Sequence, residues 1–204
     1  MSDYSSKRGA VSRRNLLQGI AVTAAAVSGV TPAMAQRARQ KVEAERTASG
    51  TYQPKALTDH EYRTLQKLAD WIIPAGANTQ GALKAGAADW IDLMSSESEE
   101  MLGIYTGGIF WLDAAMRRMH GKNFANATEA DQRELLDLIA YRKNESPELG
   151  PGIRFFAWAR KMVVDAYYTS PAGIQELGYL GNKAVSKFEV PPECMDYAIK
   201  HSPA

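Results

Sequence analysis

Hydrophobic residues recur three and four positions apart along most of the chain, which is the spacing of one helix face. The stretch 58–73 begins with Thr58-x-x-Glu61, a pattern in which two side chains cap free backbone amides at a helix start. Pro74 and Gly76 end this helix. Four later stretches have the same spacing: 85–94, 97–120, the residues from Thr128 onward, and 152–168. The pattern contains no hairpin or strand–helix–strand alternation and predicts a compact all-α domain of about five helices.

The apolar faces of these helices supply the predicted core. Gly107-Gly108 interrupts the apolar stripe of 97–120 and predicts either a kink or a close contact with another helix. The expected core residues are Leu65, Leu68, Ile72, Trp90, Ile91, Met94, Met101, Leu102, Tyr105, Ile109, Leu112, Met116, Met119, Leu135, Leu136, Leu138, Ile139, Phe155, Phe156, Met162 and Val163.

The last thirty-odd residues have a different composition, rich in glycine, proline and tyrosine. This density predicts an irregular segment rather than a solvated helix. Aromatic-rich irregular segments are often contact surfaces, although a coil packed on its own domain has the same composition. The candidate partner interface consists of Tyr167, Tyr168, Pro171, Tyr179 and Phe188.

Residues 1–35 have the pattern of an export signal. A polar stretch with four basic residues precedes an apolar run from Gly19 to Val30, and Ala33-x-Ala35 then matches the small-x-small pattern of signal-peptidase cleavage before Gln36. A membrane-spanning helix needs about 20 strongly apolar residues. The run is shorter and contains little leucine, which favours a cleaved signal over a permanent anchor.

The motif Ser12-Arg13-Arg14-Asn15-Leu16-Leu17-Gln18 resembles the twin-arginine signal S-R-R-x-F-L-K. Ser12, Arg13, Arg14, Leu16 and Leu17 carry the match. The alternative is an ordinary secretory signal in which the arginine pair occurs by chance. The twin-arginine translocase moves folded proteins into the periplasm, and its usual passengers have acquired a cofactor in the cytoplasm.

Residues 36–56, which follow the signal, are rich in charged and small polar side chains. Such a segment buries too little apolar surface to order itself. The sequence therefore predicts an arm that is flexible or is ordered by a partner, followed by the helical domain at 57–204.

The charge balance excludes a protein that binds nucleic acid through phosphate contacts. The chain has 24 basic and 23 acidic residues. The signal carries four of the basic residues and one acidic residue, so the mature chain is slightly acidic. Cys194 is the only cysteine and the three histidines are far apart, which excludes an internal disulfide framework and a zinc–thiolate cluster.

Motifs for cofactor chemistry are missing from the sequence. It has no G-x-G-x-x-G, phosphate-binding loop, H-E-x-x-H or C-x-x-C-H. Asp89 and Asp92 are three apart on a predicted helix, which is more typical of a solvated face than of a catalytic pair. His60 is expected to be exposed, and His120 to end a helix where it complements the helix dipole. The chain thus has an export signal that is typical of cofactor-bearing proteins but no motif for binding a cofactor. This combination suggests that another chain holds the cofactor.

Five short stretches, in order, resemble the gluconate 2-dehydrogenase subunit 3 family. They are residues 57–61, 68–74, 85–92, 167–173 and 177–181, and the resemblance covers about residues 57–195. It implies a helical, noncatalytic small subunit of a periplasmic dehydrogenase with no cofactor or catalytic residue of its own. The implied partners are a large FAD-dependent subunit of the glucose–methanol–choline type and a membrane-anchored cytochrome c subunit that carries haem.

Two alternatives remain open from the sequence. The chain could instead be a self-sufficient exported enzyme or a ligand-binding protein, with a pocket built from Trp71, Trp90, Trp111 and Trp158. Cys194 is a leftover cysteine in an oxidising compartment, where it forms either an intersubunit disulfide or a free thiol.

Overall fold

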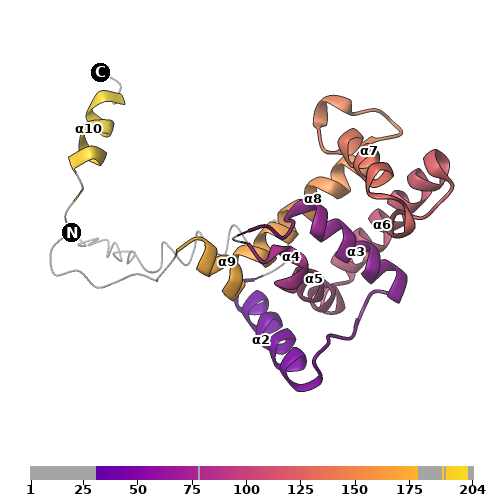
Figure 1. Ribbon diagram of the computed structural model, residues 1–204, viewed down its shortest axis with the longest axis horizontal. Coiled ribbons are helices and arrows are strands. Elements are labelled where there is room, and N and C mark those ends of the chain that lie inside the picture. The colour runs from indigo at the N-terminus through magenta and orange to yellow at the C-terminus, as the bar shows by residue number, and fades with distance from the viewer. Residues whose placement is uncertain (1–30, 78, 179–189, 191, 202–204) are drawn as a thin grey trace, which may run out of the picture.

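The computed structural model describes residues 31–77, 79–178, 190 and 192–201, and these form helices with no strand among them (Figure 1). The all-α prediction is confirmed. The helices are α2 (Pro32–Ser49), α3 (Asp59–Ile72), α4 (Gly81–Lys84), α5 (Ala87–Ser96), α6 (Glu99–His120), α7 (Glu129–Ile139), α8 (Gly150–Tyr168), α9 (Pro171–Glu176) and α10 (Pro192–His201). Two 3-10 turns are η1 (Phe124–Asn126) and η2 (Arg142–Asn144). No helix in this part of the chain is both long and apolar enough to cross a membrane.

The helix boundaries follow from capping residues that the sequence shows. Thr58 and Glu61 form the predicted capping box at the start of α3, and Thr128 forms an equivalent box at the start of α7. His120 is the last residue of α6, and Gly121 follows it with φ 71° in the left-handed region. The five predicted helices therefore correspond to α3, α5, α6, α7 and α8.

The core lies among α3, α5, α6 and α8, each of which packs against the other three. Tyr105, Phe124 and Tyr167 are its largest fully buried aromatic residues. The predicted apolar faces are buried for most of their length. Met119 and Leu138 were expected in the core but are each 37% exposed, because they lie at the edges of their helix faces.

The glycine pair in α6 marks a close helix contact. A Cβ atom at Gly108 would lie 1.9 Å from the ring of Phe155 on α8. On the same interface, a Cβ atom at Gly152 would lie 2.2 Å from the ring of Trp111. Each of the two helices thus packs an aromatic ring against a glycine of the other, and their backbones approach closely.

Gly108→Ala is expected to lower the free energy of unfolding by about 1–3 kcal/mol, the usual cost of overpacking. This loss should occur although alanine is the better helix former by up to about 1 kcal/mol. Gly103→Ala is the matched control, since no atom lies within 4 Å of its added Cβ, and should be neutral or stabilising. Urea denaturation followed by circular dichroism measures both. Equal stability of the two variants would contradict the close packing.

The arm predicted at residues 36–56 is instead largely helical, and this expectation is wrong for the chain alone. Helix α2 packs along α5 and buries Ala38 and Val42. These residues are four apart and form a narrow apolar stripe that is masked by the polar composition. The indole N–H of Trp90 also donates to the carbonyl oxygen of Ala35 at 3.0 Å.

The C-terminal part is less irregular than its composition indicates. Ser170 caps α9, and Pro171 occupies the first turn of that helix, where its missing N–H costs nothing. Helix α10 lies apart from the helical body, and all of its residues are exposed (Figure 1). Two residues of the candidate interface, Tyr179 and Phe188, lie outside the described residues.

Candidate functional site

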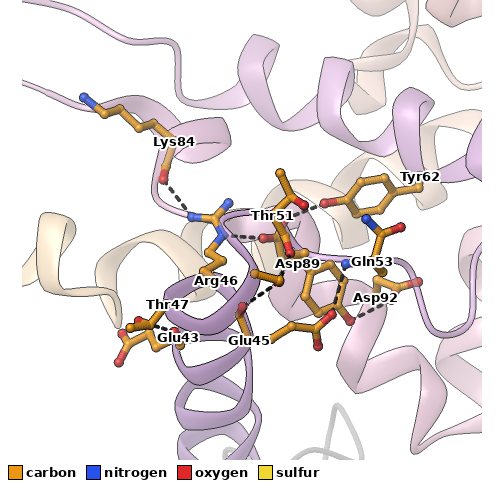
Figure 2. A network of polar contacts seen from close by, with 12 residues as sticks. Glu43, Glu45, Arg46, Thr47, Thr51, Gln53, Tyr62, Lys84, Asp89 and Asp92 are labelled. Carbon is orange, nitrogen blue, oxygen red and sulfur yellow. Dashed lines mark hydrogen bonds and ion pairs between the residues drawn. The ribbon is translucent and has the colours of Figure 1, made fainter.

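The acid pair of α5 is the one candidate for acid–base chemistry in the sequence, and it is buried. Asp89 and Asp92 are 2% and 0% exposed, so the expected solvated face is wrong. Asp89 accepts hydrogen bonds from the Arg46 Nε and the Tyr62 hydroxyl, each at 2.6 Å. Figure 2 shows Arg46 of α2 between Asp89 and the backbone carbonyl of Lys84, to which it donates at 3.1 Å. Asp89 therefore joins α2, α3 and α5.

Gly86 makes room for this arginine. It precedes α5 with φ 76°, a left-handed backbone conformation that residues other than glycine rarely adopt. A Cβ atom here would lie 3.0 Å from the guanidinium carbon of Arg46. The glycine thus both starts α5 and admits the ion pair.

Asp92 organises the connection between α2 and α3. One carboxylate oxygen accepts from the Tyr52 hydroxyl at 2.8 Å and the Lys55 amide at 2.6 Å. The other accepts from the backbone amides of Ala56 at 3.2 Å and Leu57 at 2.8 Å. Four donors converge on one buried carboxylate, which leaves it fully bonded within the fold.

The tyrosine partners are held as neutral hydrogen-bond donors. Burial, followed by the hydrogen bond to Asp92, raises the pKa of Tyr52. Burial and the hydrogen bond to Asp89 likewise raise the pKa of Tyr62. Both hydroxyls keep their protons, and through these hydrogen bonds the acid pair joins helices and a loop.

A third buried acid fixes the N-terminal start of α3. Asp113 of α6 contacts the His60 Nε2 at 2.5 Å and accepts from the Phe124 amide at 2.9 Å. His60 is therefore partly buried against Asp113, and its expected exposure is wrong. No group of three or more potential metal ligands occurs within the described ranges.

The four tryptophans do not form one pocket. The Trp90 indole faces α2, and the Trp71 indole donates to the buried Gln132 at 2.7 Å. Trp111 and Trp158 alone share a hollow, which lies between α6 and α8. The four-tryptophan pocket is therefore not assembled, because Trp71 and Trp90 serve other helix contacts.

The candidate interface residues separate into different environments. Tyr167 is fully buried, and its hydroxyl contacts the Thr79 hydroxyl at 2.8 Å and the Glu176 carboxylate. Tyr168 is partly buried and packs edge-on against Tyr167, whereas Pro171 is exposed. Cys194 is exposed on α10. Tyr167 thus belongs to the core, although its sequence context resembles a surface segment.

The export signal lies mostly outside the described residues, including Ser12, Arg13, Arg14, Leu16 and Leu17. The cleavage residues Ala33, Ala35 and Gln36 lie in the first turns of α2. Cleavage after Ala35 would remove the Thr31 cap and the acceptor of the Trp90 bond. The stripe formed by Ala38 and Val42 and the Arg46 ion pair lie beyond the cut.

The fold and its buried acids define an all-α chain whose polar interior is used to join its own helices. This chain belongs to the gluconate 2-dehydrogenase subunit 3 family, which matches residues 59–186. The family identifies it as a subunit of a dehydrogenase complex, as the sequence resemblance indicated. No curated protein and no solved structure matches the chain.

Proposed function

We propose that this chain is the noncatalytic small subunit of a periplasmic, FAD-dependent dehydrogenase, and that it stabilises and exports the catalytic subunit. The family match carries the proposal. The site geometry supports it, because each carboxylate oxygen of Asp89 and Asp92 accepts at least one hydrogen bond from inside the fold. The two side chains are also buried away from solvent, where a substrate would approach.

The chemistry of the complex then belongs to its partners. The FAD and the catalytic base lie on a large subunit of the glucose–methanol–choline type. A cytochrome c subunit takes up the electrons and holds the complex at the inner membrane. The twin-arginine translocase is a transient partner during export.

Co-purification tests the proposal. The full-length chain, tagged at its C-terminus, is expressed in the native host and recovered from the periplasm. We expect a yellow complex that contains a second chain of flavoprotein size and shows dye-linked dehydrogenase activity. Recovery of a colourless monomer that oxidises a substrate alone would contradict the proposal and favour a self-sufficient enzyme.

Cys194 offers a covalent link in this complex, because it is exposed and the periplasm is oxidising. Cys194 either forms an intersubunit disulfide with the large subunit or remains a free thiol. A disulfide would give one band at the summed mass in non-reducing electrophoresis of the purified complex, which the reductant dithiothreitol or Cys194→Ser resolves into two. Separate bands without reductant would mean that the thiol is free.

A further inference from the structure

We propose that the hollow between α6 and α8 is a docking site for the large subunit of the dehydrogenase complex. It would receive a segment that carries an aliphatic or aromatic side chain beside a carboxylate. The inference rests on the proposed function, since it names the surface through which the chain joins its partner. We call this hollow the α6–α8 groove and define it by Gly103, Gly107, Trp111, Arg154, Phe155 and Trp158.

The groove has apolar walls and is large enough for a side chain with part of its backbone. Its volume is about 420 Å³, and the rings of Trp111, Phe155 and Trp158 line it. Phe110, one turn beyond Gly107 on α6, is 69% exposed. Exposed aromatic residues beside a hollow are typical of the centres of protein interfaces.

Two glycines keep one side of the groove open. Gly103 and Gly107 lie one turn apart on the exposed face of α6, and a Cβ atom at either would meet nothing within 4 Å. The helix therefore has no internal packing reason for glycine here, in contrast to Gly108. Their cost in helix propensity, up to about 1 kcal/mol each, is explained if a partner backbone lies against them.

The charge of the rim defines the second feature of the occupant. Arg154 lines the groove, and the Lys161 ammonium lies 6.0 Å from the centre of the Trp158 ring. No acidic residue lines the groove. The nearest acid to Arg154 is Glu145, at 3.7 Å in an exposed pair that contributes little. A carboxylate on the partner would complement this basic rim.

A partner subunit is the best-supported occupant, because the family identifies the chain as part of a complex. Two other occupants have suitable chemistry. Helix α10 of this chain exposes Met195 and Ile199 beside Glu193 and Asp196, and it could dock within one chain or between two copies. The experiment separates these cases.

Gly107→Leu tests the groove directly. The leucine enters open space, so the chain should fold with a melting temperature at or above that of the wild type. Co-purification of the large subunit should fall at least tenfold. Ala44→Leu, on the exposed face of α2, is the control and should recover as much large subunit as the wild type. Trp158→Phe, which shortens the aromatic wall of the groove, and Arg154→Glu, which reverses a charge of its lining, should each weaken recovery several-fold.

Full recovery of the large subunit by folded Gly107→Leu would overturn the docking site, even with the proposed function intact. Equal loss in Ala44→Leu would also overturn it, since the effect would not be specific to the groove. A complex that survives while Gly107→Leu abolishes self-association, measured by light scattering, would assign the groove to a second copy. Hydrogen exchange on the isolated chain tests α10. If backbone amides around the groove are protected from exchange and lose that protection when residues 190–204 are deleted, α10 is the occupant. Absence of a complex with the wild-type chain would instead refute the proposed function.

Discussion

Asp92→Ala is expected to lower the free energy of unfolding by about 3–5 kcal/mol, because each buried donor left without its acceptor costs about 1–3 kcal/mol. Alanine would leave the Tyr52 hydroxyl and the amides of Lys55, Ala56 and Leu57 without their acceptor. Small domains have only about 5–15 kcal/mol of stability, so the variant should be poorly folded at 37 °C. Urea denaturation followed by circular dichroism gives the value.

Two further variants make this result specific. Asp92→Asn keeps the shape but replaces one acceptor oxygen with a donor, and should be destabilised by an intermediate amount. Asp137→Ala removes an exposed acid from α7 and should change stability by less than about 0.5 kcal/mol. A loss below about 1 kcal/mol in Asp92→Ala would show that the carboxylate does not organise the connection between α2 and α3.

Arg13→Lys with Arg14→Lys should retain both this chain and the large subunit in the cytoplasm. The substitution keeps the charge but removes the planar guanidinium groups. Lysine does not replace them where a carboxylate binds the guanidinium through two parallel hydrogen bonds. In our proposal, the large subunit must fold around FAD before it crosses the membrane and has no signal of its own. Cell fractionation with antibodies against both chains measures the effect, and dye-linked activity should move to the cytoplasmic fraction.

The basic pair Lys7-Arg8, elsewhere in the signal, provides the matched control. Lys7→Arg with Arg8→Lys changes basic residues outside the motif and should leave export at the wild-type level. If the large subunit reaches the periplasm normally in the Arg13→Lys/Arg14→Lys strain, the carrier role is wrong. The chain would then stabilise the large subunit without exporting it.

Local signals were sufficient to predict most of the fold. Thr58 and Thr128 start helices because their side chains accept hydrogen bonds from amides in the first turn. The residues involved are only three positions apart in the sequence, so the pattern is visible there. The apolar stripe of α6 has a helical period that no strand could satisfy. The Gly107-Gly108 pair indicated a close contact, although only the structure shows that Gly108 supplies it and that Gly107 faces outward.

Long-range contacts explain what the sequence did not reveal. Helix α2 is ordered by Arg46 and Asp89, which are 43 residues apart, and its composition alone resembles that of a flexible arm. Asp89 and Asp92 could have been recognised as buried, because Trp90, Ile91, Leu93 and Met94 surround them in sequence. The donors that satisfy Asp92 lie in a connection without a motif, so its role could not be predicted.

The central claim is that this chain supports a catalyst that another chain provides, and separating the purified complex tests it most directly. The subunits are separated under mild conditions, and the FAD content and dye-linked activity of each are measured. We expect all flavin in the large subunit, a colourless and inactive small subunit, and a longer activity half-life for the large subunit when the small one is added back. Stoichiometric FAD or substrate oxidation in the isolated small subunit would contradict it.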